Sequence, residues 1–332
     1  MTTHLGPTTE QITSMRTAVM ERVAPHDAAA PTALKPQSAG PRRFGLVAIG
    51  IGAIAAALIV MGVIMPVGST GGATAQAAEF LTTAANATIE TSDPVVGPGQ
   101  YLRISTNSAS GASNGGDRTM WLIPTTGVLY IPADRTHTWV WERHELPATV
   151  FFGEAGRAAA ERYDLDPDNQ NDPLRNGVLR AEGGAFFGGS VQSERVLDQL
   201  PRDPSALRDH FYDEYSGGSS SIDEDVWVRI TGLLRTGEVP ADLRAALYRT
   251  LALIPGVTIT EEEVTLDGQA GVALGRTEPA RGSIAREEII IDPITGLLIG
   301  ERTVTLADQE DIPAGTTISW SSVHTSVVDV TP

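Results

Sequence analysis

One stretch of the chain is continuously apolar. From Phe44 to Val67, glycine and a single proline are the only residues outside the hydrophobic class, and no charged residue occurs between Arg43 and Glu79. About 22 residues of this stretch would rise ~33 Å as a helix, which is enough to cross a hydrocarbon core of about 30 Å. The pattern predicts one transmembrane helix over residues 44–67.

The residues on either side of this stretch indicate its orientation. Arg42 and Arg43 precede it directly, whereas the expected linker over residues 68–76 is uncharged. Basic residues concentrate on the cytoplasmic side of a span, so we expect a cytoplasmic N-terminus and an extracytoplasmic domain over residues 77–332. Ala73-Thr74-Ala75 also resembles a signal-peptide cleavage site. Retention as an anchor is favoured, because the leader and the apolar stretch are both long for an export signal.

The N-terminal segment, residues 1–43, contains one amphipathic pattern. A helix is predicted from about Thr9 to Ala24, where Pro25 ends it, and a proline-rich linker follows. The apolar side chains of this helix fall on one face: Ile12, Met15, Val19 and Val23. A single short stripe cannot bury itself, so these four residues form the candidate contact face for a cytoplasmic partner.

Beyond the span, the pattern predicts helix first and then antiparallel strands. Apolar residues at helical spacing predict a helix over Ala77–Glu90. Alternating positions then predict strands at Gln100–Thr106, Arg118–Ile123, Gly127–Ile131 and Thr136–His144, with a turn at residues 124–127. The segment Tyr163–Gly189 is rich in Asp, Asn, Pro and Gly, which predicts a long loop.

The second half of the chain predicts helices and then strands again. The expected helices are Ser205–Tyr215, capped by Asp203 with Pro204, then Asp223–Leu234, and then a helix from Pro240 to Ile254. The expected strands are Val257–Leu266, Gln269–Arg276, Ile284–Ile291, Leu297–Leu306 and Thr316–Val330, with Asp267-Gly268 as a hairpin turn. The fold class is therefore α+β, with a curved antiparallel sheet and packed helices.

The distribution of charge excludes one class of partner. Five basic and three acidic residues give residues 1–43 a net charge of +2, so the chain total of −17 leaves −19 for the rest. A domain this acidic repels phosphate groups, and we expect no nucleic-acid partner.

No pattern of residues predicts a catalytic, metal or cofactor site. The chain contains no cysteine, which excludes disulfides and thiolate ligands. Its six histidines include no pair at the i, i+4 spacing of a helical metal site. The alternating aspartates of residues 164–172 are typical of a calcium loop, but Asn169 stands in place of the turn glycine and Arg175 in place of the bidentate acid. We expect a non-enzymatic protein without a cofactor.

One strand contains a candidate binding surface. Alternation places His137, Trp139, Trp141 and Arg143 on the same side of the strand. Two interpretations stay open: the side chains line a ligand groove on a concave sheet, or they form core beneath the helices. The second is favoured, because a stripe of large side chains is more often core.

Several short motifs resemble a family of actinobacterial single-span membrane proteins that are often encoded beside extracytoplasmic-function sigma factors. The matching motifs are Arg42-Arg43, Pro98–Leu102, Leu200–Leu207, Val239–Tyr248, Ile254–Val257 and Ile291–Gly296. The resemblance implies envelope signalling, and an outside domain similar to the half-barrel of lipoprotein-carrier and periplasmic sigma-regulatory proteins, with helices on one face. Residues 1–43 depart from a standard anti-sigma protein, since they are shorter than its sigma-binding domain and contain no cysteine for its zinc form.

Two functional hypotheses follow. The first is a membrane-anchored sensor or anti-sigma-like regulator, whose outside domain binds a lipid, an apolar ligand or a protein, and whose N-terminal helix contacts a sigma factor or another cytoplasmic protein. The alternative is an extracytoplasmic carrier or scaffold for lipid or lipoprotein that uses the span only as an anchor. An envelope hydrolase is less favoured than either.

Overall fold

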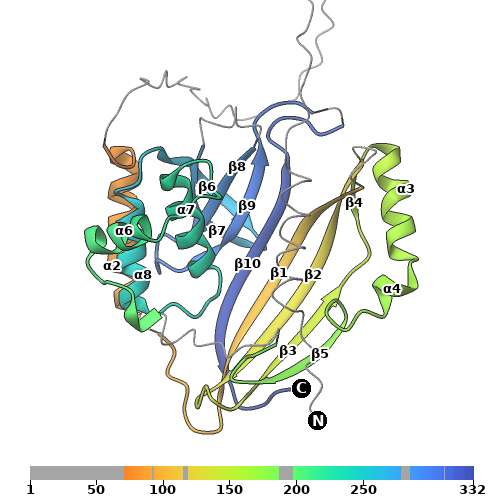
Figure 1. The fold of residues 1–332 in the computed structure, drawn as a ribbon, viewed down its shortest axis with the longest axis horizontal. Helices are drawn as coiled ribbons and strands as arrows, with labels where there is room; N and C mark the ends of the chain where they lie inside the picture. The colour runs from red at the N-terminus through yellow and green to blue at the C-terminus, as the bar shows by residue number, and fades with distance from the viewer. Residues whose placement is uncertain (1–70, 92, 115–118, 187–196, 278–284, 310) are drawn as a thin grey trace, which may run out of the picture. The chain divides into compact units, whose positions relative to one another are not determined.

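The computed structural model describes residues 71–332 apart from five gaps, at residues 92, 115–118, 187–196, 278–284 and 310 (Figure 1). The expected span and cytoplasmic segment lie outside the described residues, and so do the residues assigned to them: Arg42, Arg43, Ile12, Met15, Val19 and Val23. Within the described part, no helix combines the length and the apolar character that crossing a membrane requires.

The described strands form one large antiparallel sheet. Their bounds are β1 Tyr101–Asn114, β2 Thr119–Pro132, β3 Thr138–Glu145, β4 Val150–Phe152, β5 Gly177–Glu182, β6 Val257–Leu266, β7 Gln269–Arg276, β8 Ala285–Ile291, β9 Leu298–Thr305 and β10 Thr317–Val328. The order is β5-β3-β2-β1-β10-β9-β8-β7-β6, with β4 paired to β2. Because β1 pairs with β10, the strands from both ends of the domain join in a single open sheet.

The described helices gather near the two ends of this sheet. Their bounds are α2 Ala75–Thr91, α3 Gly153–Asp164, α4 Pro167–Gln170, α6 Pro204–Asp213, α7 Ile222–Leu234 and α8 Ala241–Leu251. Figure 1 shows α2, α6, α7 and α8 beside β6–β9, and α3 beside β4 at the other end. The predicted α+β class, with a large antiparallel sheet and helices, is confirmed.

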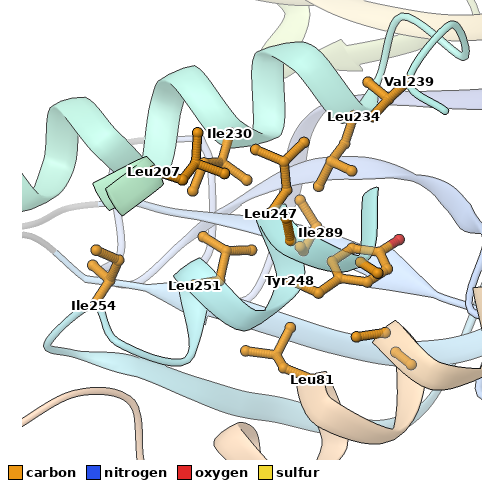
Figure 2. Packing of buried hydrophobic residues seen from close by; sticks show 14 of the residues in the cluster. Leu81, Leu207, Ile230, Leu234, Val239, Leu247, Tyr248, Leu251, Ile254 and Ile289 are labelled. Atoms are coloured by element: carbon orange, nitrogen blue, oxygen red, sulfur yellow. The ribbon is translucent and has the colours of Figure 1, made fainter. Parts of the chain in front are cut away.

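The main hydrophobic core lies between the four helices α2, α6, α7 and α8 and the C-terminal strands. Figure 2 shows side chains from these elements converging, among them Leu81, Ile230, Leu247 and Ile289. All four are at most 1% exposed. Each such burial contributes about 1.5–3 kcal/mol, so this cluster is the main stabilising part of the domain.

Local sequence fixes where two of these helices begin. The Asp203 carboxylate accepts a hydrogen bond from the backbone N–H of Ala206 at 2.9 Å, and Pro204 follows as the first helical residue of α6. Ser221 caps α7 by accepting from the backbone N–H of Glu224 at 3.1 Å. Both caps satisfy donors that a helix end leaves open, and the predicted α6 cap is confirmed.

Helices at both ends contact the same face of the sheet. Trp121 in β2 packs against Ala159 and Ala160 of α3. Residues an even number of positions apart share a face of a strand, so Ile131 lies on the same face as Trp121. Ile131 packs with Val323, which borders the main core beneath α7 and α8. We call this side of the sheet the helix face.

The turn predicted at residues 124–127 is wrong. Strand β2 runs unbroken through Pro124, which is opposite Ala109 of β1. The Pro124 carbonyl accepts from Leu146 N–H, on the side of β2 away from β1. On that side β2 pairs with β4 up to Leu122 and with β3 from Thr125 onward, so Pro124 lies between the two partner strands. The N–H and C=O of one residue point to the same side of an antiparallel strand, so the N–H that proline lacks would point into this gap. Proline is tolerated there because no ladder bond is lost.

The loop predicted over Tyr163–Gly189 is wrong in part. Strand β5 lies within it and pairs with β3 from Thr138 to Arg143. Its six residues alternate between half-buried and exposed positions, so the strand signal was present but was outweighed by the surrounding Asp, Asn and Gly. Helix α3, which ends at Asp164 just inside this segment, was not predicted.

The hairpin of the C-terminal third is confirmed. Strands β6 and β7 have the predicted bounds, and Asp267 and Gly268 join them with φ values of 49° and 79°. Positive φ at both positions is the geometry of a type I′ turn.

Candidate functional site

A cavity of about 580 Å³ opens on the helix face between α7 and the strands β1, β2, β3 and β10. Hydroxyl side chains form much of its wall: Thr106, Ser108, Ser110, Thr125, Ser319 and Ser321. The other lining residues are Ile104, Gly127, Leu129, Trp141, Arg143, Arg235, Thr236, Glu301 and Trp320. We call this cavity the groove. Its volume falls in the range of about 300–1,000 Å³ typical of small-molecule sites.

Two of the predicted residues, Trp141 and Arg143, line the groove from β3. The Trp141 ring meets Phe186 edge-on, with centroids 5.6 Å apart. The Arg143 guanidinium carbon lies 5.5 Å from the Trp141 ring centroid, and one of its nitrogens donates to the Leu174 carbonyl at 3.2 Å. Its charge also acts on the nearby Glu145 carboxyl. The Leu174 carbonyl is the one hydrogen-bond acceptor that the described residues give Arg143, so several of its five N–H donors are available to a ligand.

The other two predicted residues do not line the groove. Trp139 is 3% exposed and packs with Ile104 and Ile131 in a small core. Its indole N–H donates to the Arg135 carbonyl at 2.9 Å. His137 precedes β3, and its side chain is 72% exposed at 3.4 Å from Asp134. The stripe is therefore divided between groove, core and solvent.

An ion pair forms part of the groove wall. Arg235, just after α7, lies 3.1 Å from Glu301 of β9. Both residues also line a second cavity of about 260 Å³, which reaches under α7 to Trp227 and Glu287. The two cavities share part of their walls, so they form neighbouring compartments on the same face.

The second compartment contains a buried donor and a perturbed carboxyl. The Trp227 indole nitrogen is buried, and its N–H faces the carboxyl of Glu287, which is its acceptor in this compartment. Glu287 is an exposed residue, yet burial of its carboxyl raises its pKa, and the negative charges of Glu301 and Glu224 raise it further. These effects outweigh the hydrogen bond from Trp227 and the charge of Arg235, which lower the pKa. Protonation is therefore easier here than for a free glutamate.

A third cavity, of about 400 Å³, lies across the loop between α7 and α8. Aliphatic side chains line it together with charged residues such as Asp93, Arg244 and Asp292. The aliphatic ones include Leu102, Leu234, Val239, Leu297, Leu298 and Val323. Gly237 of the loop has φ 71°, and a Cβ there would lie 3.0 Å from the Ile104 side chain. An ion pair between Arg135 and Glu238 ties the loop to the β2–β3 connection.

Sequence reasoning missed most of the groove. The signal in β1 was a hydroxyl at every second position from Thr106 to Ser110, which is also typical of a solvent-facing strand. Arg235 and Glu301 carried no signal, because a helix end and a strand meet there only in the folded chain.

One motif with catalytic spacing was also missed. Residues 111–115 read Gly-Ala-Ser-Asn-Gly, the spacing of a nucleophile elbow. Ser113 lies in β1 opposite Met120 of β2, whereas an elbow needs a strand-to-helix turn. The local structure does not match that of a hydrolase nucleophile.

Comparison with known proteins adds no assignment. No protein-family model matches this chain, and no curated protein matches it significantly. Among the described residues, no three His, Asp or Glu side chains are grouped to hold a metal ion. The functional argument therefore rests on the groove itself.

Proposed function

We propose that this chain is a membrane-anchored, non-enzymatic sensor or anti-sigma-like regulator whose outside domain binds a small ligand in the groove. One observation carries the proposal. The groove has the volume of a ligand site, and an aromatic ring beside an arginine with available donors forms its β3 wall. Concave sites with a few convergent polar groups are the usual places for small molecules.

The expected layout of the chain supports the signalling part. A span over residues 44–67, preceded by Arg42 and Arg43, would place the groove outside and the apolar face of the N-terminal helix in the cytoplasm. The resemblance to membrane proteins encoded beside sigma factors points the same way, and a helix-covered antiparallel sheet is compatible with the half-barrel that it implies.

The aliphatic side chains of the third cavity favour a second candidate function, a carrier of lipid or lipoprotein. Its side chains of Leu102, Leu234 and Val323 suit a hydrocarbon group better than the hydroxyl wall of the groove does. In this case the span would serve only as an anchor.

The test is a pull-down of the tagged full-length protein from native membranes, compared with a variant lacking residues 2–40. Capture of a sigma factor by the full chain alone supports the regulator. Lipid or lipoprotein captured equally by both proteins, with no cytoplasmic partner, favours the carrier. An envelope-stress response unchanged by the deletion contradicts the signalling role.

A further inference from the structure

Hydroxyl groups make part of the groove wall costly for a hydrocarbon chain to cover. Seven hydroxyl side chains contribute to the lining, the six given above and Thr236. Covering a hydroxyl with an apolar group removes its water without replacing the hydrogen bond, which costs roughly 1–3 kcal/mol in proteins. A ligand with hydroxyl groups of its own avoids this cost, because each hydroxyl both donates and accepts.

The charged residues of the groove offer both kinds of hydrogen-bonding group. Arg143 presents donors beside the Trp141 ring, and Glu301 presents acceptors beside Arg235. An aromatic ring next to a guanidinium gives an apolar surface edged by donors. A sugar ring has the complementary form, with C–H groups on its faces and hydroxyls around its rim.

The second compartment extends the same chemistry under α7. The buried Trp227 N–H faces the Glu287 carboxyl, and the hydroxyls of Thr231 and Thr303 line the same space. The two cavities share Arg235 and Glu301 in their walls. A polar ligand that runs past these two residues would meet further hydroxyl and carboxyl groups here, which favours an elongated ligand.

The overall charge selects among polar ligands. Residues 44–332 carry a net charge of −19, and such a field disfavours polyanions such as phosphorylated or uronic-acid chains. A neutral ligand is not repelled. We propose, on the basis of the function proposed above, that the groove and the second compartment bind a neutral oligosaccharide, with Trp141 as the stacking surface and Arg143 as a donor to ring hydroxyls.

The experiment uses the full-length protein in an amine-oxide detergent, which has no sugar headgroup. The probes are neutral tetrasaccharides of glucose, N-acetylglucosamine, mannose and galactose, each titrated by saturation-transfer NMR and calorimetry. Replacing Trp141 by Ala should weaken binding at least about tenfold, and Trp141→Tyr should restore most of it. Arg143→Gln should weaken binding about threefold to tenfold. The affinity should not change with salt concentration.

Two control variants lie on the opposite face of the neighbouring strands. Tyr130→Ala removes an aromatic ring from β2, and Arg103→Gln removes a guanidinium from β1. Both should bind like the unmodified protein. Thermal melting of every variant separates loss of ligand contact from loss of fold.

A photoreactive fatty acid distinguishes failure of this inference from failure of the proposed function. Saccharide binding that is lost in Trp141→Ala and kept in Tyr130→Ala supports the inference. Fatty-acid crosslinks mapped to β1–β3, with no saccharide bound, overturn the oligosaccharide but retain a ligand-binding domain. Binding of neither probe, or saccharide binding unaffected by Trp141→Ala, contradicts the inference, and the first of these also contradicts ligand binding in the groove.

Discussion

The first prediction concerns Glu288 of β8, whose carboxylate joins neighbouring strands on the face of the sheet away from the helices. The residue is 1% exposed, and its neighbour in the strand, Ile289, points to the helix face. One carboxylate oxygen lies 2.6 Å from the Arg286 guanidinium, and the other accepts from Arg302 at 2.7 Å. Arg302 also pairs with Glu261 of β6 at 2.6 Å. The cluster links three strands.

Replacing Glu288 by Gln keeps the shape and removes the charge. Removing one partner of a buried ion pair costs about 3–5 kcal/mol. We expect the lower end, about 3 kcal/mol, because Arg302 keeps Glu261 as a partner and the Arg286 side chain is 24% exposed. This corresponds to about a hundredfold change in the folding equilibrium.

The assay is urea unfolding of the full-length protein, followed by tryptophan fluorescence. Glu263→Gln, at an exposed position of β6, is the matched control and should change stability by less than about 0.5 kcal/mol. A loss below about 1 kcal/mol for Glu288→Gln would refute the reasoning, because the carboxylate would then contribute no more than a surface charge.

The stability lost in Glu288→Gln should depend on pH. Burial alone would raise the Glu288 pKa, but hydrogen bonds from Arg302 and Arg286 outweigh it and hold the pKa below its usual value. A folded-state pKa below the unfolded one contributes stability above the unfolded pKa of about 4.3, and that stability is lost as pH falls through the folded pKa. The stability difference between the two proteins should therefore shrink in acid, and a difference independent of pH would contradict this.

Three further substitutions test separate features. Gly237→Ala should destabilise by about 1–2 kcal/mol in urea unfolding, because φ is positive and the new methyl meets β1 and β10; an unchanged midpoint would contradict this. Tyr248→Phe should lower stability by about 1–2 kcal/mol, since the buried hydroxyl donates to the Gly296 carbonyl at 3.0 Å; hydrogen exchange at the β8–β9 turn should rise. Asp203→Ala should cost about 1 kcal/mol, and Asp203→Asn, which can still cap, should restore most of it.

The parts of the fold that local chemistry decides were predictable from the sequence. Asp267-Gly268 requires a tight turn with positive φ, and the flanking strands have the predicted bounds. The cap at Asp203 and the row of buried side chains along α7 are each determined by residues within a few positions of one another in the sequence. Such features do not depend on distant parts of the chain.

The parts that depend on distant contacts were not predictable. The pairing of β1 with β10 joins Tyr101 to Val328, and nothing local indicates it. Pro124 suggested a turn because the gap between β3 and β4 cannot be read from β2 alone. In the same way, alternation placed Trp139 and Trp141 on one face, but the position of α7 and its following loop decides which of them lines the groove.

The most direct test of the groove as a ligand site is mass spectrometry of small molecules that co-purify with the full-length protein from native membranes. Three proteins are compared: the unmodified chain, Trp141→Ala and Tyr130→Ala. The account predicts a molecule retained by the first and third and absent from the second. The same molecules in all three, or none in any, would contradict it.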